Sequence, residues 1–166
     1  LAKNPLTNSN GIPTGAIYGF VNYLIRLIEI YKCPYLTVVL DSSVKTFRHE
    51  MYEQYKANRD EMPDELKVQI PLIKDVVNAF NIPMICQDGL EADDLIASLT
   101  KKAVDNGFDV FLVTKDKDLM QLIGPHVKML APDGTGVLQL FDEKDVVDKL
   151  GVPPGKVLDY LSLIGD

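Results

Sequence analysis

The chain has 166 residues, of which 46% are apolar, and a formal net charge of −7. This is enough apolar sequence to fill the core of one domain, and no apolar run is long enough to span a membrane. The acidic charge would disfavour a nucleic-acid partner if it were spread evenly over the surface. The two cysteines, Cys33 and Cys86, have neither metal-ligand spacing nor a disulfide framework around them, and there is no signal-peptide pattern, so we expect a reduced, cytoplasmic protein.

Short apolar runs alternate with helical patterns along the chain. Helices are predicted, in order, over residues 14–31, 63–80, 91–106, 142–150 and 154–164, with a short one after Asp118. Strands are predicted over residues 36–41, 84–87 and 109–113, followed by a hairpin over 127–141 that turns at 132–136, where glycines allow positive φ. This alternation predicts the α/β class, as one domain with a mainly parallel sheet and helices on its faces.

Most of seven candidate carboxylates lie where predicted strands end or predicted helices begin. They are Asp41, Glu91, Asp93, Asp94, Asp116, Asp118 and Asp166. In an open α/β sheet the carboxyl ends of the strands form the ligand crevice, where clustered carboxylates repel one another unless a cation lies between them. Oxygen-only ligands suit Mg²⁺ or Mn²⁺. Setting these seven aside leaves 17 acidic against 17 basic residues, so the net charge does not exclude a nucleic-acid substrate.

Most of these acids also have an ordinary explanation when they are taken alone, Asp118 as a surface residue, whereas Asp166 alone is uninformative. Acids in the first turn of a helix interact favourably with its dipole, which covers Glu91, Asp93 and Asp94. Asp116 fits a helix N-cap, and Asp41 fits an Asx turn. Only their expected joint placement on one edge of one sheet favours a divalent-metal site.

The segment from Lys45 to Arg59 is expected to form a helix with a basic and aromatic stripe. On a helical wheel six side chains fall within an arc of about 100°. They are Lys45, Arg48, Tyr52, Tyr55, Lys56 and Arg59. Cations bind phosphates and aromatic rings stack on exposed bases, which predicts a nucleic-acid-binding face. The alternative is a solvated helix whose charges pair one turn apart, as Glu53 and Lys56 could.

Five segments of the chain resemble, in the same order, the 5′ nuclease domain of bacterial DNA polymerase I, a member of the PIN-like superfamily. They are PLTNSNGIPTGAIYGF (5–20), VVLDSSVKTFRHEMYEQYKANR (38–59), GLEADDLI (89–96), VTKDKDLMQLI (113–123) and GVPPGKVLDYLSLIGD (151–166). TFRHE followed by YKANR, then EADD and DKD, is a specific combination, whereas any one of these motifs alone is weak. The resemblance covers nearly the whole chain.

The resemblance implies a PIN-like α/β fold, with helices on both faces of the sheet and a helical arch insertion over about residues 42–62. It implies that the seven carboxylates hold two or more Mg²⁺ or Mn²⁺ ions. The positions of Tyr55, Lys56 and Arg59 correspond to the arch or gateway through which the 5′ strand passes. Lys56 and Arg59 are then catalytic, because they stabilise charge that grows on the phosphate. The implied activity is that of a 5′-3′ exonuclease and flap endonuclease, which removes primers or flaps of Okazaki fragments in DNA replication and repair.

The expected partner is DNA with a 5′ end or flap, and an RNA primer strand is a second candidate. We expect no membrane partner, and we expect a monomer in the bacterial cytoplasm, at the nucleoid, with fusion to a polymerase domain left open. The chain resembles a catalytic core trimmed at both ends, since the family's first strand and its C-terminal helix–hairpin–helix region are absent. Two alternatives stay open: a nucleic-acid-binding remnant without activity, and an Mg²⁺-dependent phosphohydrolase of small molecules.

Overall fold

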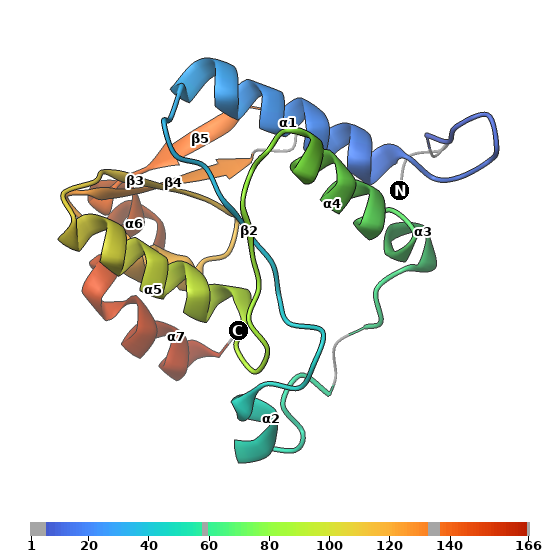
Figure 1. Cartoon of the computed structure of the whole chain (residues 1–166). Helices are drawn as coiled ribbons and strands as arrows, with labels where there is room; N and C mark the ends of the chain where they lie inside the picture. The colour runs from blue at the N-terminus through green and yellow to red at the C-terminus, as the bar shows by residue number, and fades with distance from the viewer. Residues whose placement is uncertain (1–5, 58–59, 133–136, 166) are drawn as a thin grey trace. The chain divides into compact units, whose positions relative to one another are not determined.

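The computed structural model describes residues 6–57, 60–132 and 137–165, which fall into two compact units. Unit 1 spans Leu1–Glu91 and unit 2 spans Ala92–Asp166 (Figure 1). Each unit has helices, a small sheet and a hydrophobic core of its own. The expectation that the whole chain forms one domain stays a prediction.

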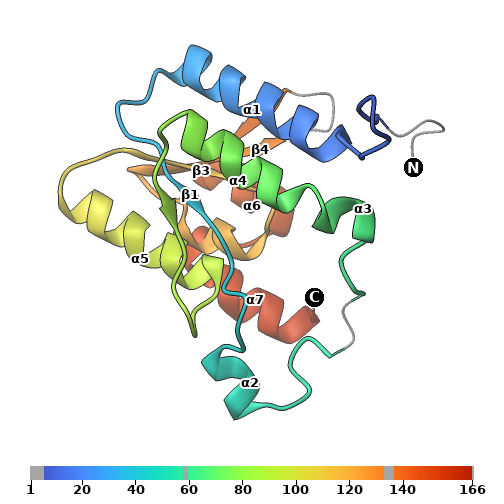
Figure 2. The same cartoon turned by 45° about the vertical axis from the view of Figure 1, so that its right-hand side comes forward.

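Unit 1 combines a long helix, several shorter helices and a two-stranded sheet. Its elements are α1 (Gly15–Tyr31), β1 (Val38–Val39), α2 (Phe47–Met51), α3 (Asp64–Lys67), α4 (Ile70–Ala79) and β2 (Met84–Ile85). β1 and β2 pair in parallel, with Val38 opposite Met84. α1 and α4 lie side by side (Figures 1 and 2), and Leu24, Val77 and Ile82 form the buried core.

The N-terminus of α1 is capped by a side chain from a distant part of unit 1. Thr14 occupies the N-cap position but makes no side-chain hydrogen bond to the helix. Instead, Oε1 of the buried Gln69 accepts hydrogen bonds from the Ala16 N–H at 2.9 Å and the Ile17 N–H at 3.1 Å. The amide nitrogen of Gln69 donates to the Glu65 carbonyl oxygen at 2.7 Å. Gln69 therefore satisfies two N–H groups that have no partner within the helix.

The region predicted as one helix over residues 63–80 contains two helices, so that prediction is wrong in this detail. α3 ends at Lys67 and α4 begins at Ile70. Pro71 accounts for the break, because proline has no N–H to donate and its ring clashes with the carbonyl four residues earlier, here that of Lys67. The first turn of a helix tolerates proline, and Pro71 lies there in α4.

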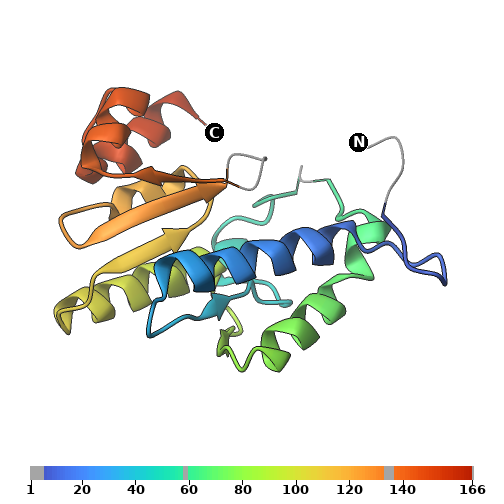
Figure 3. The same ribbon diagram turned by 90° about the horizontal axis from the view of Figure 1, so that it is seen from above.

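Unit 2 is a three-stranded sheet with helices packed against it. Its elements are α5 (Ala92–Asp105), β3 (Val110–Val113), η1 (Asp118–Leu122, a 3-10 helix), β4 (Val127–Pro132), β5 (Leu138–Phe141), α6 (Glu143–Leu150), η2 (Pro154–Lys156) and α7 (Val157–Ile164). β4 and β5 form the predicted antiparallel hairpin, whose turn at 133–136 lies outside the described residues. Figure 3 shows α5 next to β3 and α6 next to β5. Met120, Met129, Val146 and Val157 are fully buried in the core.

The predicted α/β class and its parallel strand pairing are confirmed, since β1 pairs in parallel with β2 and β3 with β4. The hydrogen bonds of the described residues form two sheets, one in each unit. β1 and β2 contribute only two residues each. None of the described helices combines the length and the apolar character that a membrane crossing requires.

Candidate metal and nucleic-acid site

Asp41 and Glu91 lie beyond the carboxyl ends of the two strands of unit 1. Because β1 and β2 are parallel, these ends share one edge of the sheet. Asp41 is exposed, and its carbonyl oxygen accepts a hydrogen bond from the thiol of Cys86, just after β2, at 3.5 Å. Glu91 lies after the turn that follows β2, and only 8% of its surface is exposed. The sheet therefore positions these two predicted ligands at the edge where the sequence places them.

Three side chains from the segment that follows β1 converge on the Glu91 carboxylate. The Lys56 ammonium donates to Oε1 at 2.8 Å, and the Tyr55 hydroxyl donates to Oε2 at 3.2 Å. The guanidinium of Arg48 lies 3.8 Å from Oε2. A carboxylate with little access to water needs such charged and hydrogen-bonding partners. The structure thus brings three predicted DNA-binding residues onto one predicted metal ligand.

α2 is fixed at its start by a capping box that involves a histidine. The Thr46 N–H donates to Nδ1 of His49 at 3.2 Å, and the Phe47 N–H donates to the Gly89 carbonyl oxygen at 3.4 Å. The His49 ring also meets the Tyr55 ring edge-on, with 5.3 Å between centroids. The sequence did not predict this cap, because the usual capping box has Glu or Gln at the position that His49 occupies here.

The predicted continuous helix with its basic and aromatic stripe is wrong. α2 ends at Met51, Tyr52 is extended at φ −147°, and Lys56 is left-handed at φ 57°. The segment offers few apolar side chains that a longer helix could bury, and most helical stability in proteins comes from such packing. Of the stripe, only Arg48 lies within a described helix. The other members are Lys45 and Tyr52, which are exposed, Tyr55 and Lys56, which are half-buried against Glu91, and Arg59, which lies outside the described residues.

Asp116 and Asp118 form a tight turn after β3, at the carboxyl end of a strand in unit 2. The Thr114 hydroxyl oxygen accepts from the Asp116 N–H at 3.0 Å, and Oδ1 of Asp116 accepts from the Asp118 N–H at 2.9 Å. Both aspartates are exposed. Asp93 and Asp94 are half-buried in the first turn of α5. Each of these positions agrees with the strand end or helix start that the sequence predicts.

The predicted ligands are all carboxylates, which is the donor set that a hard divalent cation takes. In the described structure, the nearly buried Glu91 carboxylate is paired with the Lys56 ammonium. Among residues 6–57, 60–132 and 137–165, however, no three acidic, histidine or cysteine side chains are placed to hold a metal ion. Asp166 lies outside the described residues. The assignment of the seven carboxylates as ligands therefore stays a prediction.

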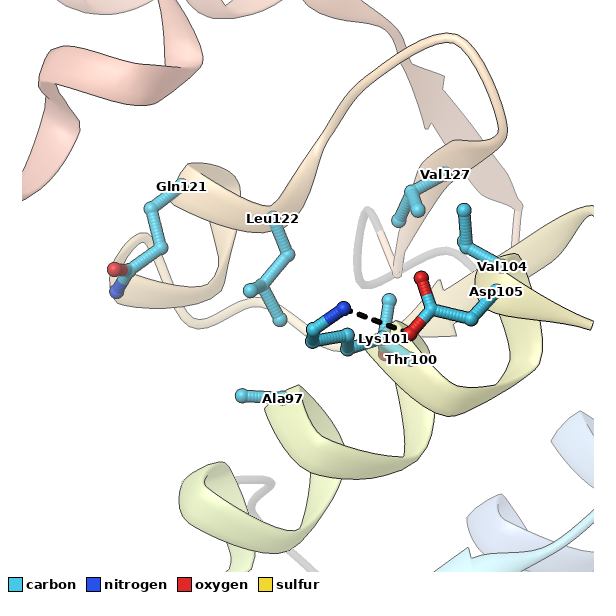
Figure 4. Close-up of a pocket in the computed structure, with 8 residues that line it drawn as sticks. All are labelled: Ala97, Thr100, Lys101, Val104, Asp105, Gln121, Leu122 and Val127. Carbon is cyan, nitrogen blue, oxygen red and sulfur yellow. Dashed lines mark hydrogen bonds and ion pairs between the residues drawn. The ribbon is translucent and has the colours of Figure 1, made fainter.

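An open pocket of about 300 Å³ lies between α5 and η1 in unit 2 (Figure 4). Leu122 and Val127 line its apolar side, and an ion pair of 2.7 Å joins Lys101 to Asp105 beside it. None of the predicted site residues lines this pocket, so it does not belong to the candidate site.

Solved structures with the same fold are nucleases. A T5 5′-exonuclease with bound zinc superposes with a TM-score of 0.71 at 23% identity, over 90% of this chain and 58% of that one. A bacteriophage T5 flap endonuclease in complex with DNA and metal ions also has a TM-score of 0.71, at 22% identity over 93% of this chain and 59% of that one. The catalytic core of Rad2 in complex with DNA substrate has a TM-score of 0.57, at 20% identity over 97% of this chain and 49% of that one. These likenesses confirm the predicted α/β fold.

The sequence is closer to bacterial proteins. It is 44% identical over 165 residues to a 5′-3′ exonuclease of Aquifex aeolicus, covering 99% of this chain and 56% of that protein. It is also 44% identical over 165 residues to DNA polymerase I of Caldicellulosiruptor bescii, covering 97% of this chain and 19% of that protein. The chain thus spans about half the length of the first relative and a fifth of the second. The family described as 5′-3′ exonuclease, N-terminal resolvase-like domain, matches residues 1–151, and the chain belongs to this family.

Proposed function

We propose that the chain is the catalytic core of a divalent-metal-dependent 5′-3′ exonuclease and flap endonuclease, which hydrolyses phosphodiester bonds of DNA. The observation that carries this proposal is the cluster at Glu91, where Lys56, Tyr55 and Arg48 meet a nearly buried carboxylate. Membership of the 5′-3′ exonuclease family supports it. So does the fold of a flap endonuclease that has been crystallised with DNA and metal ions.

The chain's own side chains divide into those that hold the strand and those that act on the phosphate. Arg48 and Lys45 bind phosphates, and the exposed ring of Tyr52 stacks on an unpaired base. Lys56 and Arg59 stabilise the negative charge that grows on the phosphate as water attacks it. The residues that hold the strand are expected to set the affinity for DNA, and those that act on the phosphate are expected to set the rate of cleavage. Mutations in the two sets should therefore have separable effects.

Two or more Mg²⁺ or Mn²⁺ ions would be held by Asp41, Glu91, Asp93, Asp94, Asp116, Asp118 and Asp166. Bound ions of this kind supply activation of a water molecule and stabilisation of the leaving oxygen. The carboxylates that hold them repel one another in the absence of a cation, so their assembly depends on the ion. Glu91 avoids this repulsion in the described structure by pairing with Lys56.

The proposed substrate is DNA with a 5′ end or flap, including the RNA primer strand of an Okazaki fragment, in DNA replication and repair. The proposed setting is a bacterial cytoplasm, where the protein acts as a monomer at the nucleoid. Relatives named DNA polymerase I match this chain over a fifth or less of their length, which supports fusion to a polymerase domain. A second candidate function is binding of nucleic acid without cleavage. The exposed Lys45 and Tyr52 and the partly exposed Arg48 are consistent with it, since binding needs only these contacts to phosphates and bases.

Replacing Asp116 by Ala separates the two functions. This variant removes a proposed metal ligand whose side chain is exposed and accepts one hydrogen bond, from the Asp118 N–H, so the fold is expected to persist. Mg²⁺-dependent cleavage of a 5′-flap duplex is expected to fall below detection, while DNA affinity stays the same or rises because a negative charge near the phosphate is lost. Gel analysis of cleavage and fluorescence anisotropy of binding measure the two effects.

Asp109→Ala is the matched control, since Asp109 is an exposed aspartate of the same unit that pairs with His126 and is not a proposed ligand. It is expected to cleave like the unmodified protein. Normal cleavage by Asp116→Ala would remove Asp116 from the metal site. If the unmodified protein and Asp109→Ala bind flap DNA but leave it intact, the binding-only function is correct.

A further inference from the structure

Phe47 is an aromatic residue on the surface of α2 that the proposed function leaves without a role. It is the first residue of the helix, and 42% of its surface is exposed. Met51 lies one turn later on the same side of α2 and is 80% exposed. Figures 1 and 2 show α2 away from α1 and α4, which supply Leu24 and Val77 to the core of unit 1. The Phe47 ring therefore lies outside that core.

The backbone that carries the Phe47 ring is held at the start of α2. The Phe47 N–H donates to the Gly89 carbonyl oxygen at 3.4 Å, and the nearly buried Thr46 forms the capping box with His49. An aromatic side chain has only two torsions, so it loses little conformational entropy when it binds a partner. A ring on a held backbone is therefore suited to binding.

Two cations lie close to Phe47 in the chain. The guanidinium of Arg48 lies over the Phe47 ring, 4.7 Å from its centroid, and 3.8 Å from Oε2 of Glu91. The ring and the carboxylate thus orient this guanidinium, and the Arg48 side chain keeps 30% of its surface exposed. Lys45, two residues before Phe47, is also exposed. Proteins that bind single-stranded nucleic acid combine cations for the backbone with aromatic rings on which bases stack.

We infer that the Phe47 ring stacks on a base of the single-stranded part of the substrate, beside the phosphate that Arg48 binds. The positive charge of the flanking side chains favours a nucleic acid over an apolar protein partner as the occupant of this surface. Bases within a duplex are already stacked on one another, so the ring adds affinity for single strands above all. This inference rests on the proposed function, since it takes the segment that contains α2 as the surface that binds the 5′ strand.

Tryptophan fluorescence tests the stacking directly. The chain contains no tryptophan, so Phe47→Trp introduces a single indole. A single-stranded oligothymidylate is expected to quench its fluorescence, because a base stacked on the indole quenches it. An abasic oligonucleotide of the same length offers the same phosphates without bases and is expected to leave the fluorescence unchanged. EDTA in every sample keeps the DNA intact and makes the measurement independent of metal ions.

Phe80→Trp is the matched control. Phe80 belongs to the same unit and is 40% exposed, but it follows α4 and is not part of the proposed site. Its indole is expected to keep its fluorescence with both oligonucleotides. Equal quenching in the two variants, or equal quenching of Phe47→Trp by both oligonucleotides, would overturn the inference. So would unquenched Phe47→Trp at concentrations where anisotropy shows the oligothymidylate to be bound.

Phe47→Leu provides a second, independent measurement. It keeps an apolar side chain but removes the aromatic face, and circular dichroism checks that it remains folded. Anisotropy is expected to show about tenfold weaker binding of the oligothymidylate, the loss of one base–aromatic stack, with unchanged binding of the abasic oligonucleotide. The salt dependence is expected to stay the same, because no phosphate contact is lost. Unchanged affinity for the oligothymidylate, or an equal loss for both oligonucleotides, would overturn the stacking role.

These measurements separate failure of the inference from failure of the proposed function. If the unmodified protein binds no single-stranded DNA, the proposed function and the stacking role fail together. If the unmodified protein binds and cleaves a 5′ flap while Phe47→Leu binds the oligothymidylate equally well, the stacking role alone fails. The exposed ring then serves another partner, such as a protein with an apolar surface.

Discussion

At the scale of single residues, Arg48 offers the cleanest test of DNA binding. It lies within α2, its guanidinium stands 4.7 Å above the Phe47 ring, and its side chain is 30% exposed. Arg48→Ala is expected to weaken DNA binding at every sequence and to lower the salt dependence of log K by up to about one unit of slope, as loss of one phosphate contact does. Anisotropy titrations at several KCl concentrations measure both quantities.

Lys67→Ala serves as the control for Arg48→Ala, because it removes a cation of the same unit that lies outside the proposed DNA-binding set. Its slope is expected to match that of the unmodified protein. An unchanged slope in Arg48→Ala would show that this side chain serves Glu91 instead of a phosphate.

The sequence predicted where the candidate site residues lie relative to strand ends and helix starts, but it did not predict their contacts. Strand ends and helix starts placed Asp41, Glu91 and Asp116 where the structure has them. The pairing of Lys56 with Glu91 joins residues 35 positions apart and depends on a left-handed backbone. Neither helical nor strand periodicity encodes such a contact, so the sequence alone could not predict it.

At the scale of elements, the start of α1 depends on Gln69. Gln69→Ala leaves the Ala16 and Ile17 N–H groups without their acceptor and is expected to lower the free energy of unfolding by about 1–3 kcal/mol. Urea denaturation followed by circular dichroism measures the loss. Gln121→Ala is the comparison, since the exposed Gln121 only donates to the Asp118 carbonyl oxygen; equal losses in the two variants would contradict the capping role.

α6 begins with a second cap whose contribution depends on pH. Asp142 is its N-cap, and the hydrogen bond from the Asp145 N–H, with that from the Lys144 N–H, holds the pKa of Asp142 below its ordinary value. A carboxyl with a lowered pKa stabilises the fold at pH values above its unfolded-state pKa, and this contribution is lost as the pH falls through the folded-state value. Asp142→Asn is therefore expected to be less stable than the unmodified protein at neutral pH, with the gap closing in acid.

Thermal unfolding at a series of pH values checks this expectation. Asn accepts the same hydrogen bonds without charge, so the comparison isolates the charged form of the cap. A difference in stability between Asp142→Asn and the unmodified protein that stays constant down to acid pH would contradict the pH-dependent role of Asp142.

The elements that the sequence misjudged share one cause. The helix over 63–80 is interrupted before Pro71, and the predicted helix over residues 45–59 stops at Met51. In both places the spacing of side chains agreed with a helix. Spacing does not show that proline interrupts the backbone hydrogen bonds, as at Pro71, or that a helix has too few apolar side chains to pack, as after Met51. The long periodic helices α1 and α5, by contrast, lie within a residue or two of their predicted bounds.

At the scale of the whole molecule, the proposed ligands are divided between the two units. Asp41 and Glu91 belong to unit 1, whereas Asp93, Asp94 and Asp116 belong to unit 2. Each unit has its own buried core, so each can hold its carboxylates in place independently.

The most direct test of the central claim is cleavage of a flap by the purified protein. A duplex with a single-stranded 5′ flap, labelled at its 5′ end, is incubated with Mg²⁺ or with EDTA and resolved on a denaturing gel. A metal-dependent 5′ nuclease is expected to release short labelled products with Mg²⁺ and none with EDTA. Intact DNA in both lanes, at protein concentrations where anisotropy shows the flap to be bound, would contradict the assignment of this chain as a nuclease.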